Sequence, residues 1–114
     1  MALAELYTGT EAVSTTEWSL TTDTAGPDTN TTEGIYQAFI DVSDMIAGDQ
    51  LRLKIYEKVR SGDTQRLLYQ KVLTGIQSEP VFVTPALHLK HGWDYTLYAV
   101  AGTITVNWSI RQVA

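Results

Sequence analysis

Both histidines of the chain, His88 and His91, lie in one short stretch, and Asp94 follows three residues later. Two imidazoles and a carboxylate are ligands that zinc accepts, so this stretch is the first candidate for chemistry. Pro85 and Gly92 leave no room for a helix that would bring both rings to one face. On a strand, positions 88 and 91 point to opposite faces. We therefore predict a turn that enters a strand at Asp94, and no metal site.

A second group of possible ligands consists of Asp41, Asp44 and Asp49. Hard cations such as calcium prefer carboxylate oxygens, but the glycine position and the terminal glutamate of an EF-hand loop are missing. Aspartates in turns usually accept hydrogen bonds from nearby backbone amides. We predict this capping role and no calcium site. Residues 41–49 are also the best helical segment of the chain, although they are long enough for a single turn only.

Other catalytic patterns are missing from the sequence. It contains no G-x-S-x-G elbow for a serine nucleophile and no glycine-rich phosphate-binding loop. It also contains no cysteine, which excludes disulfides, thiolate metal ligands and thiol chemistry. We predict that the protein is not an enzyme and that it needs no cofactor.

Length and charge narrow the class of partner. The chain has 114 residues, enough for one domain with its own core. Thirteen acidic and eight basic residues give a net charge of -5, which disfavours nucleic-acid binding. No apolar run is long enough to span a bilayer, and the N-terminus lacks the pattern of a signal peptide. We expect no nucleic-acid or membrane partner and synthesis in a cytoplasm.

Hydrophobic residues recur with a period of two, which is typical of half-buried strands. Residues 50–60 place Leu51, Leu53, Ile55 and Val59 on one face. The last such segment places Ile104, Val106, Trp108 and Ile110 on one side. Further strands are expected at residues 17–21, 34–42, 65–73 and 95–100.

Turns separate these segments. Ala101 and Gly102 predict a tight hairpin between the last two strands. Pro80 and Pro85 bracket residues 81–84, which we expect to form an edge strand or a bulged connection, because proline cannot donate to a ladder. Seven or eight short strands with this spacing predict an all-β fold of two packed antiparallel sheets.

The first third of the chain looks different from the rest. Residues 21–34 are rich in threonine, with little to bury, and predict a long surface loop. The first dozen residues are expected to form an extended arm. We thus divide one domain into an arm and loop at 1–33 and a sandwich core at 34–114. Arm and loop would fray in a monomer and could lie across a neighbour in an assembly.

The three tryptophans receive different predictions. Trp18 and Trp108 lie in phase with inward aliphatic residues and are assigned to the core. Trp93 and Tyr95 lie beside a turn, so we expect them to be exposed or at a subunit contact. Exposed aromatic rings could also stack on sugars.

Half of the basic residues of this acidic chain lie on one predicted strand: Arg52, Lys54, Lys58 and Arg60. Two interpretations remain open, a solvated face whose lysines guard a sheet edge and a docking stripe for an acidic partner. The candidate interface residues are Arg52, Lys54, Tyr56, Lys58, Arg60, Trp93 and Tyr95.

The segments "GIYQAFIDVSDMIAGDQLRLKIYEKV" and "HGWDYTLYAVAGTITVNWSIRQV" resemble small structural proteins encoded in the head gene clusters of tailed bacteriophages. The resemblance covers roughly residues 34–113 and includes the "AGD" turn before the strand "LRLKIYEKV". It implies a jelly-roll-like β-sandwich that decorates or cements a capsid, often as a trimer. It implies no catalytic residues.

The resemblance leads us to expect a non-enzymatic virion protein, made in the host cytoplasm, that binds the major capsid protein lattice on the outer capsid surface as a homotrimer. The alternative is a carbohydrate-binding β-sandwich module of a phage tail or receptor-binding structure, which would use Trp93 and neighbouring tyrosines.

Overall fold

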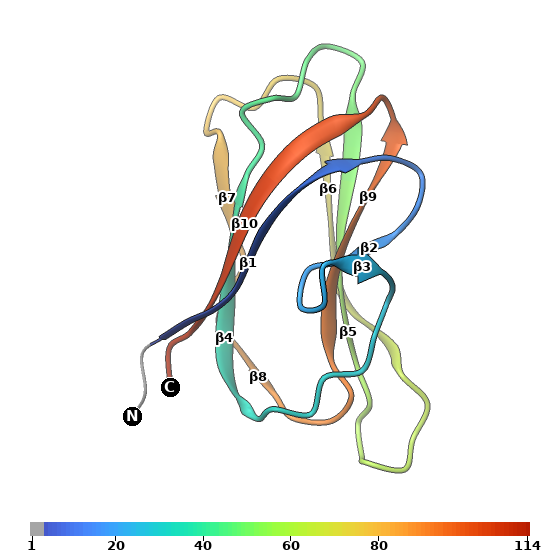
Figure 1. Ribbon diagram of the computed structural model, residues 1–114, viewed down its shortest axis with the longest axis vertical. Helices are drawn as coiled ribbons and strands as arrows, with labels where there is room; N and C mark the ends of the chain where they lie inside the picture. The colour runs from blue at the N-terminus through green and yellow to red at the C-terminus, as the bar shows by residue number, and fades with distance from the viewer. Residues whose placement is uncertain (1–3) are drawn as a thin grey trace.

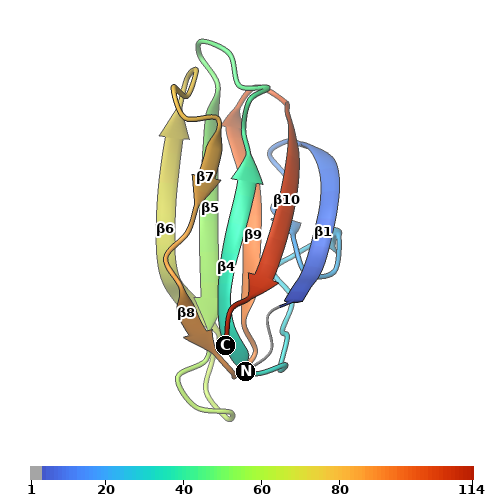
Figure 2. The ribbon, with the colours of Figure 1, turned by 90° about the vertical axis from the view of Figure 1, so that its left-hand side faces the viewer.

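The computed structural model describes residues 4–114, which form two antiparallel sheets packed face to face (Figures 1 and 2). One sheet has the order β1-β10-β4-β7, with β8 also paired to β4, and the other has the order β3-β2-β9-β5-β6. None of the described residues forms a helix that could cross a membrane. The strands are β1 (Ala4–Val13), β2 (Trp18–Ser19), β3 (Thr24–Ala25), β4 (Gly34–Asp41), β5 (Gln50–Glu57), β6 (Arg66–Thr74), β7 (Val81–Val83), β8 (Leu87–Leu89), β9 (Asp94–Ala101) and β10 (Ile104–Gln112).

The strand pairing is that of a jelly roll. β1 pairs with β10, β2 with β9, β4 with β7 and β8, and β5 with β6. Of the ten strands, β7 and β8 lie in line along β4 and share one position, and the two-residue β3 adds an edge position beside β2. Without β3, the eight remaining positions are those of a jelly roll, which consists of two Greek keys. The predicted all-β, jelly-roll-like sandwich is confirmed, with ten strands instead of seven or eight.

The break between β7 and β8 has a local cause. At this point the hydroxyl of Thr84 accepts the backbone N–H of Ala38 at 2.9 Å, a role that a backbone carbonyl would have in a continuous ladder. Pro85 follows and has no N–H to donate. The predicted edge strand at residues 81–84 is confirmed as β7, which is the outer strand of its sheet.

The core lies where the alternation predicted it. All four predicted inward residues of β10 are buried, and so are the alternate residues Leu51, Leu53 and Ile55 of β5. Trp18 differs, because it is only half-buried and its indole N–H donates to Asp23 Oδ1 at 3.0 Å. The predicted single helical turn at residues 41–49 is a pair of hydrogen-bonded turns.

Val59 does not belong to the core, and its prediction is wrong. β5 ends at Glu57, and the side chain of Val59 is 86% exposed. The carboxylate of Glu57 accepts the backbone N–H groups of Lys90 and His91 at 2.7 and 3.1 Å. These contacts hold the chain beside the turn before β9, so the next residues leave the sheet.

The predicted hairpin at Ala101 and Gly102 is also wrong. β9 pairs with β2 and β5 in one sheet, whereas β10 pairs with β1 and β4 in the other. The turn therefore crosses between the sheets, and Gly102 adopts a φ of 86°, which favours glycine. A tight turn between two half-buried strands has the same sequence pattern whether the strands pair or face each other across the core.

The N-terminal segment is part of the sandwich, in contrast to the predicted arm. β1 pairs along β10 from Ala4 opposite Gln112 to Val13 opposite Ile104. Gly9 lies against the indole of its partner Trp108, where a Cβ would come within 2.5 Å of the ring. Residues 1–3 of the expected arm lie outside the described residues.

The end of the hydrophobic face of β5 gives a stability prediction. Leu53 is 1% exposed and Val59 is 86% exposed, although one sequence pattern assigned both to the core. We expect Leu53→Ala to lower the free energy of unfolding by about 2–5 kcal/mol, because it leaves a cavity. Val59→Ala should change it by less than about 0.5 kcal/mol. Urea unfolding of the two variants measures both values, and equal losses would place Val59 in the core.

Candidate functional site

Trp93 and Tyr95 are buried, so the prediction that they are exposed or at a subunit contact is wrong. Both are 0% exposed. The ring of Trp93 lies 4.5 Å from that of Tyr36, 5.9 Å from that of Tyr95 and 6.0 Å from that of Tyr7. Its indole N–H donates to the carbonyl of Thr32 at 3.0 Å. These rings form an internal aromatic cluster and cannot serve as a platform for a sugar.

Asp94 begins β9, as predicted, but its carboxylate is buried. It accepts the hydroxyl of Thr21 at 2.7 Å, the backbone N–H of Asp28 at 2.8 Å and that of Tyr95 at 2.9 Å. Burial raises the pKa of Asp94, and the hydrogen bonds oppose part of that rise. The bonds to Thr21 and Asp28 attach the threonine-rich loop to the core.

A backbone contact fixes the same loop further along. The N–H of Asn30 donates to the carbonyl of Trp93 at 2.9 Å, and the N–H of Trp93 returns a bond of 2.8 Å. The side chain of Asn30 also donates to the hydroxyl of Tyr7 at 2.8 Å. Residues 21–34 are therefore anchored within a single chain, in contrast to the prediction that they would fray in a monomer.

The two histidines are not brought together with Asp94. His88 is on β8 and contacts Glu33 at 2.8 Å, with Lys90 3.8 Å from the same carboxylate. The hydrogen bond from His88 and the charge of Lys90 lower the pKa of Glu33. Within residues 4–114, no three side chains of the types that bind metals gather into a site.

The three aspartates at residues 41–49 accept hydrogen bonds from backbone amides, which confirms their predicted capping role. Asp41 and Asp49 accept N–H groups two and three residues away, at 2.9 and 3.0 Å. Asp44 accepts the N–H of Thr105 at 3.2 Å, at the start of β10. Each carboxylate serves a different turn.

The basic stripe is shorter than the sequence predicted. Arg52, Lys54 and Tyr56 project from the outer face of β5, opposite the buried residues. Beyond the end of the strand, the aliphatic stem of Lys58 packs against Gly92. A Cβ at Gly92 would come within 2.9 Å of this stem.

Arg60 is separate from this face. It lies in the loop between β5 and β6 and pairs with Asp63 at 3.1 Å. β5 itself lies between β9 and β6, so Arg52 and Lys54 do not guard a sheet edge, and that part of the interpretation is wrong, whereas a solvated sheet face stays open.

Tyr56 and its neighbours form a fixed group on the outer face. The hydroxyl of Tyr56 donates to Glu17 Oε2 at 2.6 Å, and the hydroxyl of Thr96 donates to the same oxygen. Burial raises the pKa of Tyr56, and the hydrogen bond to Glu17 adds to the rise. The carboxylate of Glu17 is thus held by two hydroxyls.

Arg52 and Lys54 converge on Tyr98 of β9, and we call these three residues the cationic cluster. Tyr98 is directly opposite Arg52 in the ladder. The guanidinium carbon of Arg52 lies 5.8 Å from the centre of the tyrosine ring, and Lys54 Nζ lies 4.9 Å from it. The Nη1 of Arg52 donates to the tyrosine hydroxyl at 3.1 Å. Its Nε is buried and has no partner within residues 4–114.

The sequence prediction missed Tyr98. The signal was available, since Tyr95, Leu97 and Ala99 share the inward phase of β9 and position 98 therefore points outward. The prediction chose Tyr95 for its place beside a turn.

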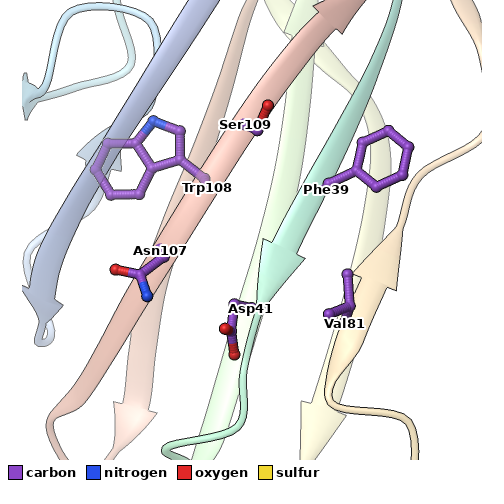
Figure 3. A pocket seen from close by; sticks show the side chains of 6 residues that line it. All are labelled: Phe39, Asp41, Val81, Asn107, Trp108 and Ser109. Carbon is purple, nitrogen blue, oxygen red and sulfur yellow. The ribbon is translucent and has the colours of Figure 1, made fainter. Parts of the chain in front are cut away.

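The opposite sheet has a shallow pocket of about 200 Å³ (Figure 3). Phe39 and Asp41 of β4 face it beside Asn107 and Ser109 of β10. The guanidinium of Arg111 lies 3.8 Å from the centre of the Phe39 ring and covers it. The pocket therefore offers no free aromatic face. Its lining residues are Phe39, Asp41, Val81, Asn107, Trp108 and Ser109.

β6 and β7, edge strands of the two sheets, lie side by side (Figure 2). A larger hollow, of about 630 Å³, is lined by residues of both strands. Lys71 of β6 reaches toward Phe82 of β7, with 6.0 Å between the ammonium and the ring centre. Exposed apolar side chains lie on both edges. They are Leu67, Leu68, Val72, Val81 and Val83.

Comparison with known proteins gives little. No protein-family model matches the chain, and no curated protein sequence matches it. The structure is similar to "Structure of Eiger TNF from S. frugiperda", with a TM-score of 0.46 and 13% identity over 95% of this chain and 86% of that one. At this TM-score, the likeness supports no inference about function.

The buried carboxylate gives a pH prediction. Burial raises the pKa of Asp94 in the folded state above its value in the unfolded state. At pH values between these two pKa values, the folded state therefore binds more protons than the unfolded state. The contribution of Asp94 to the free energy of unfolding should therefore decrease as pH rises from about 4 to about 7. Urea unfolding of the wild type and of Asp94→Asn at both pH values measures this decrease.

The other carboxylates titrate in both the wild type and Asp94→Asn. The difference between the free energies of unfolding of the two proteins therefore reports on Asp94 alone. We expect the advantage of the wild type over Asp94→Asn to be smaller at the higher pH. A difference that grows toward neutral pH would mean that the folded-state pKa is lowered instead.

Proposed function

We propose that this chain is a non-enzymatic virion protein that binds the outer surface of a tailed-phage capsid and stabilises it. The observation that carries the proposal is the cationic cluster. Arg52 and Lys54 lie on the outer face of a central strand, and within residues 4–114 neither forms an ion pair. The resemblance of residues 34–113 to phage head proteins supplies the identity of the partner.

Charge favours such a contact. The chain has a net charge of -5, and Arg52 and Lys54 place two positive charges beside one tyrosine ring on its surface. A local positive field steers an acidic partner surface to this face and sets the orientation of docking. The partner is the lattice of the major capsid protein.

Many weak contacts suffice for stabilisation. A capsid presents the same site in many copies, and a trimer that contacts several of them gains avidity without any new contact type. We therefore keep a homotrimer as part of the proposal.

The alternative, a carbohydrate-binding module, depended on Trp93 and neighbouring tyrosines. Trp93 and Tyr95 are buried, and the half-buried ring of Phe39 has Arg111 against it. No observation favours that function over the first.

Capsid binding can be measured directly. The purified chain is mixed with capsids assembled from tailed-phage major capsid proteins, and the bound fraction is measured by co-sedimentation. We expect Arg52→Gln with Lys54→Gln to reduce binding by roughly tenfold or more, because each side chain makes a charge-assisted contact.

The matched control is Arg60→Gln with Lys90→Gln, which changes the net charge equally. Both control residues already have carboxylate partners. The control should bind as the wild type does. A wild-type chain that does not sediment with capsids would contradict the proposed function.

The oligomeric state gives a separate test. Light scattering of the purified protein over a dilution series should give three times the mass of one chain at every concentration. A mass equal to one chain at every concentration would contradict a pre-assembled trimer. Assembly on the capsid would then be measured by the number of chains that sediment with each capsid.

A further inference from the structure

We propose that the cationic cluster is a binding site for one carboxylate group of an acidic protein partner, which Arg52, Lys54 and Tyr98 hold together. The inference rests on the proposed function for the identity of that partner as a capsid protein. The chemistry of the site is argued from the cluster itself.

The hydroxyl of Tyr98 supplies a donor that is already oriented. It accepts a hydrogen bond from Arg52 Nη1 at 3.1 Å, so its own proton is free to be donated. Within residues 4–114, that hydroxyl makes no hydrogen bond as a donor. A carboxylate oxygen that lies beside the ring edge would accept this proton.

An anion would stabilise the positions of Arg52 and Lys54, because their two positive charges repel each other. Both lie within 5.8 Å of the centre of one tyrosine ring, and two like charges gathered at one ring repel each other. Cation–π contact with the ring offsets only part of that repulsion. A single negative charge between them relieves it and turns both groups into donors of charge-assisted bonds.

The protein partner of the proposed function makes the anion a carboxylate. The Nε of Arg52 is buried and Nη1 is bonded to Tyr98, so the guanidinium cannot bind an anion through the Nε–Nη edge, and the site depends on the remaining donors. Lys54 adds a point charge and Tyr98 one hydroxyl. These donors match the two oxygens of a carboxylate.

The surroundings fit a glutamate or aspartate side chain. Val72 of β6 is directly opposite Arg52 on the same outer face and is 39% exposed, so it offers an apolar contact for the methylene groups next to the carboxylate. On the other side, Glu17 is already held by Tyr56 and Thr96. Its charge directs an incoming carboxylate toward the Val72 side.

The test uses a hexaglutamate peptide as the probe and the full-length protein in low salt. NMR titration follows the side-chain signals of Arg52, Lys54 and Tyr98. We expect saturable shifts at all three. Lys54→Gln should weaken binding by roughly tenfold and Tyr98→Phe by roughly fivefold, because they remove a charged and a neutral donor respectively.

Two controls make the site specific. Arg60→Gln removes one positive charge outside the cluster and should leave the affinity for hexaglutamate unchanged. A loss as large as that of Lys54→Gln would mean diffuse charge attraction and would overturn the proposal. Inorganic phosphate is titrated in parallel, and tighter binding of phosphate than of hexaglutamate would overturn the assignment to carboxylate.

The outcomes also separate this inference from the proposed function. If hexaglutamate does not bind while capsid sedimentation still depends on Arg52 and Lys54, the carboxylate site is wrong and the capsid function stands. If hexaglutamate binds at the cluster and capsids do not bind the chain, the site stands and the capsid function is wrong.

Discussion

The buried carboxylate of Asp94 is the constraint on which the arrangement of the loops depends. It forms no ion pair within residues 4–114, so hydrogen bonds alone must offset the loss of its hydration. One donor, Thr21, lies in the turn between β2 and β3, and another, Asp28, lies in the segment that leads from β3 in one sheet to β4 in the other. A polar loop with little apolar surface to bury is thereby fixed to the core by hydrogen bonds.

The aromatic cluster completes this anchoring and determines what remains for the surface. Trp93, Tyr95 and Tyr36 are fully buried, and the indole N–H is bonded to the loop. Among the aromatic rings on the outer sheet faces, Tyr98 and Phe39 lie against basic side chains, and Tyr56 is hydrogen-bonded to Glu17. These faces therefore offer charge and hydrogen bonds more than exposed aromatic surface.

The cationic cluster lies on the more rigid part of the molecule. β5 is paired along its length on both sides, with β9 and with β6. The backbone of such a strand needs no ordering on binding, which lowers the entropic cost of a contact there. The open side between β6 and β7 has the opposite character, with a hollow and exposed apolar residues at two sheet edges.

The sequence by itself determined the all-β class, the inward residues Leu51, Leu53 and Ile55 of β5 and those of β10, the capping role of the aspartates and the outward direction of Arg52, Lys54 and Tyr56. These follow from the two-residue period of a strand and from turn chemistry, which are local. The tertiary structure decided that β9 and β10 lie in different sheets, that Trp93 and Tyr95 are buried, and that Tyr98 is opposite Arg52. Each of these depends on which distant segment pairs with or covers a strand, and the same local pattern is compatible with several such partners.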